Sequence, residues 1–217
     1  MVKLLDYSFA RPDPSRVKAA GYSGVIRYLS HSASKTLTAA ERDVLHANGL
    51  GIALLWDSSR HRPLTSRNGG YFDGAHANAM ASVLDWPKDR PIYTAIDIHT
   101  VRDGLKIVAN YLGGFEAAIW PHPLGIYGEI EIIEFCARYD TPYLWQTQPW
   151  QRVEVSSRAR IVQLVDPTGF PDTDLDVIQG PEDTDWGGWF NAPPTRGEVM
   201  KGNGCLRSKN TIPTQYR

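Results

Sequence analysis

Short, largely apolar segments rich in β-formers recur along the chain, and helical patterns follow each of the first five. Alternate side chains of a β-strand share one face, so each segment offers an apolar face to a core. The predicted strands of this part cover residues 2–6, 24–30, 51–57, 91–100 and 124–127. The predicted helices cover residues 14–20, 38–48, 75–86, 101–120 and 129–139, with a break expected at Gly113 and Gly114.

The pattern changes after residue 140. Strands are predicted at residues 142–148, 160–166 and 173–178, and the linkers between them are short. The six residues 167–172 cannot hold a parallel crossover, which needs a dozen or more, so these strands should include antiparallel neighbours. The sequence therefore predicts one α/β, TIM-like barrel over residues 1–180, with about five βα units followed by three strands with few helices. Two separate small domains are the weaker alternative, because no linker divides the chain.

Two segments stand apart from this pattern. Residues 58–70 are polar, basic and rich in turn formers, and this long loop is a candidate substrate loop. Residues 181–217 are rich in Gly, Pro, Asn and Thr and form a predicted irregular C-terminal extension. The extension either packs on the barrel, docks onto a partner, or is simply flexible.

Composition narrows the function classes. The 217 residues are 42% hydrophobic with a formal charge of −1, which gives no electrostatic reason to expect nucleic acid. Cys136 falls in a helical pattern and is expected to be a buried thiol, so the two cysteines imply no disulfide framework. We expect no membrane span and no signal peptide, because the N-terminus is interrupted early by Asp6. The protein is expected in the cytoplasm at synthesis, or exported by a route that its own N-terminus does not encode.

Polar residues gather where the predicted strands end. The acids and imidazole at strand ends are Asp6, Asp57, Asp97, His99, Asp174 and Asp176. Further hydrogen-bonding groups within the strands are Arg27, Tyr28, Tyr127, Gln146 and Gln163, which are candidates to bind a substrate. Barrel closure should bring these residues to one mouth. The plain alternative is that the last polar residues of each strand are only solvated.

Several carboxyls around one cavity repel each other, so at least one should have a raised pKa. A glycosidase needs such a protonated carboxyl to protonate the leaving oxygen, together with an ionised partner. Alternatively, Asp6, Asp57 and Arg27 form an ion-pair network that only closes the barrel, since Arg27 inside a strand needs partners. A divalent ion held by Asp6, Asp97 and His99 is a further option, although no metal-ligand motif and no nucleotide-binding motif is present. We expect no cofactor.

The order of several short motifs resembles a known family. DYS at 6–8, GVIRYL at 24–29, the stretch ending in GIALLWD at 57, and IYTAIDI at 92–98 are similar to the glycoside-hydrolase-like barrels of actinobacteria and their phages. These barrels are remote relatives of the glycoside hydrolase family 25 lysozymes. LWQTQ at 144–148, IVQLVD at 161–166 and DLDVI at 174–178 resemble the late strands of those lysozymes.

The resemblance implies residue roles. Asp6 matches the first-strand acid of the lysozymes, Asp97 an acid of the fourth strand, and Asp174 the last-strand acid. His99 stands where the lysozymes have a glutamate that serves as general acid, which puts the inherited mechanism in doubt. Asp57 is the carboxyl best placed to take over that role.

The leading hypothesis is a domain that acts on the peptidoglycan of bacterial cell walls and travels with a phage particle or resides in the host cytoplasm before release. Asp97 would work with Asp6 or Asp57, one as acid and the other as base or nucleophile. The alternative is a non-catalytic carbohydrate-binding or virion-structural barrel, with residues 181–217 contacting virion or tail proteins. A metal-dependent hydrolase is the third option.

Overall fold

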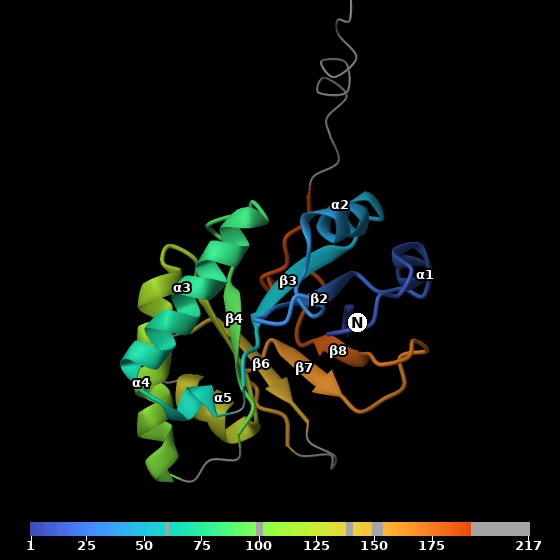
Figure 1. The fold of residues 1–217 in the computed structure, drawn as a ribbon. Helices are drawn as coiled ribbons and strands as arrows, with labels where there is room; N and C mark the ends of the chain where they lie inside the picture. Colours follow the sequence, from blue (N-terminus) through green and yellow to red (C-terminus); the bar gives the residue numbers. More distant parts are fainter. Residues whose placement is uncertain (60, 99–101, 138–140, 149–153, 192–217) are drawn as a thin grey trace, which may run out of the picture.

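The computed structural model describes residues 1–59, 61–98, 102–137, 141–148 and 154–191, and these residues form a closed barrel (Figure 1). The strands follow one another around the barrel in chain order. They are β1 Lys3–Asp6, β2 Gly24–Leu29, β3 Gly51–Trp56, β4 Ile92–Ile96, β5 Leu124–Gly128, β6 Tyr143–Thr147, β7 Ile161–Leu164 and β8 Asp174–Ile178. The predicted TIM-like α/β barrel is confirmed.

Strand direction confirms the expectation for the last strands. β1 to β7 are mutually parallel neighbours, whereas β8 runs antiparallel to both β7 and β1. The segment 165–173 between β7 and β8 is too short for a parallel crossover, so the chain turns back. As a result, the amino end of β8 meets the carboxyl end of β1, and Asp174 is the direct neighbour of Asp6.

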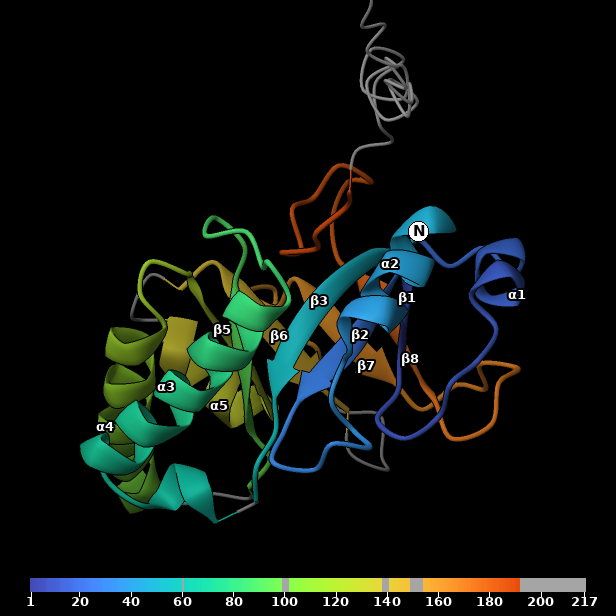
Figure 2. The same ribbon diagram turned by 45° about the horizontal axis from the view of Figure 1, so that its top comes forward.

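Helices follow the first five strands on the outside of the barrel. They are α1 Pro14–Ala19, α2 Ala39–Ala47, α3 Arg67–Val83, α4 Arg102–Ile119 and α5 Ile130–Cys136, with a short 3-10 turn at Arg62–Leu64. α3 and α4 lie side by side on one flank of the barrel (Figure 2). The side-chain oxygen of Thr38 accepts a hydrogen bond from the Glu41 backbone and caps the start of α2, in agreement with the predicted helix over residues 38–48.

Two expectations about α3 and α4 are wrong. α3 begins at Arg67 and not at residue 75, so the expected loop 58–70 is shorter and contains the 3-10 turn. α4 continues through Gly113 and Gly114. A Cβ on Gly114 would collide with the backbone oxygen of Arg67, so this glycine lets two helices approach closely. The sequence shows the glycines but not the partner helix that requires them.

Alternation along the strands divides the buried residues into two layers. An interior layer fills the barrel and includes Leu4, Ile26, Leu55, Tyr93 and Trp145. A larger outer layer packs the other strand faces against the helices. In the part of the chain that the structure describes, no helix is long and apolar enough to cross a membrane.

Residues 185–190 cover the end of the barrel at which β1 to β7 begin. Trp186 is buried in the interior layer, and its backbone oxygen accepts a hydrogen bond from the Tyr93 hydroxyl at 2.9 Å. The backbone of Trp189 pairs with that of Ile52 through two hydrogen bonds. We call this the tryptophan end. The first described residues of the predicted extension thus pack on the barrel, and the division at residue 180 stays a prediction.

Candidate functional site

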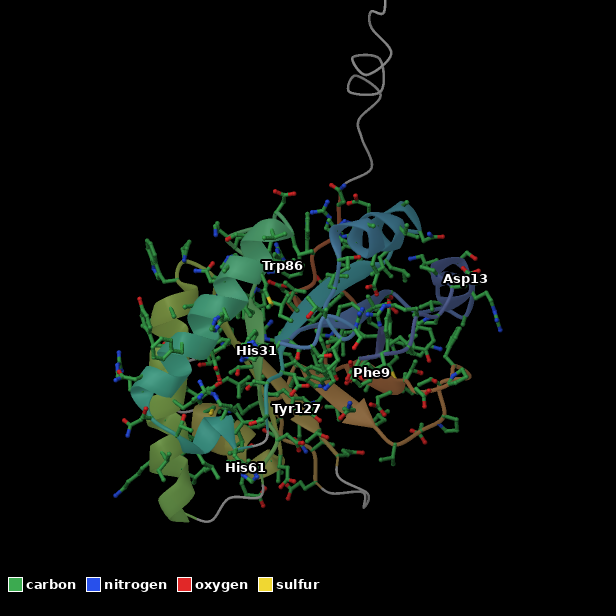
Figure 3. All side chains as sticks on the ribbon, in the orientation of Figure 1. Phe9, Asp13, His31, His61, Trp86 and Tyr127 are labelled. Carbon is green, nitrogen blue, oxygen red and sulfur yellow. The ribbon has the colours of Figure 1, made fainter. Side chains whose placement is uncertain are left out.

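The opposite end of the barrel carries the polar side chains. Leu4 and Ile178 lie in the interior layer, so Asp6 and Asp176, each two residues away along its strand, face the interior as well. The polar residues that alternation places on this face are Asp6, Tyr28, Asp57, Asp97, Tyr127, Thr147, Gln163, Asp174 and Asp176. We call this end, where β1 to β7 finish and β8 starts, the acidic end. Figure 3 shows Tyr127 in the midst of the side chains inside the barrel.

Asp6 is the central group of the acidic end. It is only 2% exposed. Its Oδ2 accepts a hydrogen bond from the Tyr28 hydroxyl at 3.1 Å and another from the Gln163 amide nitrogen at 3.3 Å. Its Oδ1 is buried and has no hydrogen-bond partner among the described residues. A buried carboxyl with a bare oxygen is an unfavourable place for a negative charge.

The protonation state of Asp6 follows from these surroundings. Burial, and next the charge of Asp174, raise the pKa of Asp6 from 3.8 to about 8. The hydrogen bond from Tyr28 and the more distant charge of Arg27 act in the opposite direction but are outweighed. At neutral pH, Asp6 is therefore a carboxylic acid that still holds its proton.

Two more acids come from β8. Asp174 is exposed at the rim, and partial burial of its carboxyl raises its pKa. Asp176 lies deeper and is fully buried. Its Oδ1 accepts a hydrogen bond from the Trp145 indole at 2.7 Å, whereas its Oδ2 has no partner among the described residues. Burial, together with the charge of Asp6, raises the pKa of Asp176 well above its ordinary value.

Gln163 links three strands through its amide. The hydroxyls of Tyr127 on β5 and Thr147 on β6 both donate to its Oε1, each at 2.9 Å. Burial raises the pKa of Tyr127, and the charges of Asp6, Asp97 and Asp176 act in the same direction. All three acids are thus close enough to act on one phenol. Sequence reasoning missed Thr147, although its alternation with Trp145 was a usable signal.

The remaining predicted acids lie around the rim. Asp57 follows β3 and forms an ion pair with Lys35 at 2.7 Å, with both side chains one quarter exposed. Asp97 lies just beyond the end of β4. His99 falls outside the described residues. Its expected place at the barrel mouth therefore stays a prediction. Lys35 was also missed, because it lies in the loop after β2 and contacts Asp57 only in the folded chain.

Arg27 does not join the acids, which corrects its expected place. Its strand neighbours Ile26 and Tyr28 face the interior, so Arg27 points outward. The guanidinium is fully buried and donates to the Glu41 carboxylate on α2 at 2.6 Å, as well as to the backbone oxygen of Tyr7. The expectation that Asp6 and Asp57 pair with Arg27 is therefore wrong.

Gln146 also faces away from the acids. It is fully buried, its Nε2 donates to the backbone oxygen of Glu154 at 2.9 Å, and its Oε1 accepts from the backbone nitrogen of Ser156 at 2.8 Å. These two bonds hold the segment that leads into β7. Gln146 thus has a structural partner in place of the expected contact with a substrate.

A cavity adjoins the acidic end. It is lined by Leu164 at the end of β7, by residues 165–171 of the following segment, and by Thr173 and Asp174, and it has a volume of ≈ 630 Å³. Ligand pockets in proteins commonly have volumes of this order. Within the described residues, no group of three or more His, Cys, Asp or Glu side chains is placed to hold a metal ion.

The fold is a closed α/β barrel with buried acids at one end of its interior. Comparison with known proteins places this barrel in a family. The model of a family described as "Rv2525c-like, glycoside hydrolase-like domain" matches residues 15–179, and the chain belongs to this family. The resemblance noted in the sequence is thereby confirmed.

Individual relatives are more distant. The chain is 26% identical over 155 residues to the "Putative peptidoglycan hydrolase Rv2525c" of Mycobacterium tuberculosis, and the match covers 66% of this chain and 65% of that protein. The crystal structure of the Tat-secreted Rv2525c with L-tartrate superposes with a TM-score of 0.77 at 23% identity, covering 87% and 98% of the two chains. The bacterial lysozyme of Streptomyces coelicolor gives 0.59 at 15%, covering 83% and 93%. These likenesses show a shared fold.

Proposed function

We propose that the chain hydrolyses the glycan strands of bacterial peptidoglycan and that Asp6 is the acid that protonates the glycosidic oxygen. The observation that carries this proposal is the burial of the Asp6 carboxyl at the acidic end, which raises its pKa to about 8, together with the lack of a hydrogen-bond partner for its Oδ1 among the described residues. General acid catalysis of this kind requires a carboxyl that keeps its proton at the working pH. Membership of a glycoside-hydrolase-like family and the name of the mycobacterial relative support the choice of substrate.

The chemistry needs two carboxyls in different states. The proton of Asp6 passes to the leaving oxygen while the bond between that oxygen and the anomeric carbon breaks. An ionised carboxylate then either attacks the anomeric carbon or takes a proton from the attacking water. Asp57, which is ion-paired with Lys35, and Asp97 are the candidates for this second role. A carboxyl separation of about 5–5.5 Å leads to retention of configuration and about 6.5–9.5 Å leads to inversion.

The rim of the acidic end offers a surface for a sugar. The Phe9 side chain, three residues after Asp6, is 60% exposed, and the Lys35 ammonium lies 5.4 Å from its ring centroid. Exposed aromatic rings can stack on the apolar faces of sugars. The cavity beside Asp174 gives room for further groups of the glycan.

One observation favours a second candidate, a barrel that binds glycan without cleaving it. Asp6 and Asp176 are almost completely covered by protein. A covered acid can protonate a bound sugar only if the acidic end opens or the sugar inserts deeply. Location in a phage virion, with virion or tail contacts through residues 181–217, rests on the sequence resemblance alone and stays a prediction.

Digestion of purified peptidoglycan tests the proposal. Wild type, Asp6→Asn and Asp172→Asn are incubated with cell walls at pH 6, and new reducing ends are counted by borohydride labelling. Asp172 is exposed and has a positive φ, which Asn also tolerates, so this variant is a matched control. We expect cleavage by wild type and Asp172→Asn and a loss of at least about 100-fold in Asp6→Asn. Binding without new reducing ends in wild type would instead establish the second candidate.

A further inference from the structure

The hydrogen bonds around Asp6 distinguish its two oxygens. Oδ2 receives two donors, the Tyr28 hydroxyl and the Gln163 amide nitrogen, whereas Oδ1 receives none from the described residues. In a protonated carboxyl, the carbonyl oxygen has two lone pairs suited to two donors, and the hydroxyl oxygen is the weaker acceptor. With both neighbours donating to Oδ2, this oxygen takes the part of the carbonyl oxygen and leaves Oδ1 to carry the proton.

The structure turns the NH₂ group of the Gln163 amide toward Asp6, because its Oε1 accepts hydrogen bonds from Tyr127 and Thr147. The opposite orientation would place Oε1 against Oδ2 of Asp6 and the NH₂ group against the two hydroxyls, which can also accept hydrogen bonds. Asp6 would then have to carry its proton on Oδ2 and donate it to Gln163. A hydrogen bond to the neutral carboxyl raises its pKa, so the two orientations predict opposite shifts of the Asp6 pKa when Gln163 is removed.

We infer that Gln163 is a positioning residue: held by Tyr127 and Thr147, it orients the Asp6 carboxyl so that Oδ1 is the oxygen that presents a proton to the substrate. Gln163 touches Asp6 and acts through it. Its role therefore differs from the direct substrate contact that the sequence suggested. The catalytic use of this proton rests on the proposed function, whereas the orientation of Asp6 does not.

The Asp6 carboxyl can be titrated without any substrate. The ¹³C shifts of aspartate carboxyls are followed against pH in wild type and in Gln163→Met, and the Asp6 resonance is identified by its loss in Asp6→Asn. A hydrogen bond from Gln163 favours the ionised form of Asp6. Its removal should raise the titration midpoint by about one pH unit.

Gln146→Met is the matched control. Gln146 lies on β6, next to β7, and its amide bonds the backbone of Glu154 and Ser156 on the other face of the sheet. We expect the Asp6 midpoint to stay unchanged in this variant. If Gln163→Met does not fold, Thr147→Val replaces it, since loss of one donor to Oε1 loosens the amide and should raise the midpoint by a smaller amount.

An unchanged or lowered midpoint in the folded Gln163→Met protein, or in Thr147→Val where it replaces that variant, would overturn the inference. An equal rise in Gln146→Met would also overturn it, because a general loosening of the barrel would then suffice. Since no substrate is used, failure of this titration counts against the positioning role alone. Absence of glycan cleavage by wild type counts only against the proposed function. Where cleavage occurs, the alkaline limb of its pH profile should move upward by the same amount as the midpoint.

Discussion

The two ends of this barrel differ in whether their buried polar atoms have hydrogen-bond partners. At the tryptophan end, the hydroxyls of Tyr93 and Tyr143 donate to the backbone of Trp186 and the carboxylate of Asp185, so the polar groups that are covered there have partners. At the acidic end, Asp6 and Asp176 each keep one buried oxygen without a partner among the described residues. Buried polar groups left unsatisfied in a folded protein require an explanation. Under the proposed function, the tryptophan end closes the barrel, and the acidic end is the one that would carry out the chemistry.

The largest expected change in stability comes from a substitution that disrupts the tryptophan end. Trp186→Ala removes a side chain buried in the interior layer and should lower the free energy of unfolding by about 3–5 kcal/mol. Trp120→Ala is the control, because Trp120 is 78% exposed and its loss should cost far less. Urea unfolding at pH 6 measures both. A small loss in Trp186→Ala would show that residues 185–190 are not needed to close the barrel.

The next largest effect is at the acidic end, where a substitution should raise the free energy of unfolding. Asp6→Asn should raise the free energy of unfolding at pH 7 by roughly 3 kcal/mol, because wild type must bind a proton to this carboxyl on folding at that pH, whereas the amide is neutral in both states. The folded-state pKa of Asp6 lies above its ordinary value of 3.8, so the folded chain holds a proton that the unfolded chain loses. Wild-type stability attributable to this group is therefore greatest below about pH 4 and falls as the pH rises toward about 8.

Unfolding curves across this pH range for wild type and Asp6→Asn measure the difference. We expect the variant to show a flatter dependence on pH, with the gap between the two proteins closing near pH 4. Asp172→Asn should follow wild type. A variant that is less stable than wild type at pH 7 would mean that Asp6 is held ionised by contacts that outweigh its burial.

The smallest effect lies on the rim. Lys35→Met removes the ion pair with Asp57, and because both side chains are one quarter exposed, the cost in unfolding free energy should stay below about 1 kcal/mol. Thermal unfolding at low and moderate salt measures this cost. A loss of unfolding free energy of more than twice that size would show that the rim contributes to stability as a buried core does. The two ends would then not differ as described.

Much of the fold could be predicted because it depends on local patterns. Short apolar segments rich in β-formers predict the strands, and the short segment between the last two strands predicts their antiparallel pairing. The order of the strands predicts that Asp6 and Asp174 lie at the same end of the barrel. The packing of helix against helix could not be predicted from the sequence. Gly113 and Gly114 read as a break because the neighbouring helix α3 that needs them is visible only in the folded chain.

The site was less predictable, for two different reasons. Arg27 and Tyr28 are adjacent in one strand and cannot both face the interior, so strict alternation would have removed Arg27 from the acids. The same rule separates Gln146 from Thr147. In contrast, the pairing of Arg27 with Glu41 joins a strand to a helix. The lack of a partner for Asp6 Oδ1 among the described residues depends on the positions of all the neighbouring donors. Neither is encoded in a local pattern.

The proposed role of Asp6 as a protonated acid at the acidic end of the barrel can be checked by the rate of peptidoglycan cleavage as a function of pH. Because the pKa of Asp6 is about 8, the account predicts a rate that is maintained at neutral pH and falls as the pH rises through that value. A rate that stays level or increases through pH 8 would contradict the assignment of Asp6 as the acid.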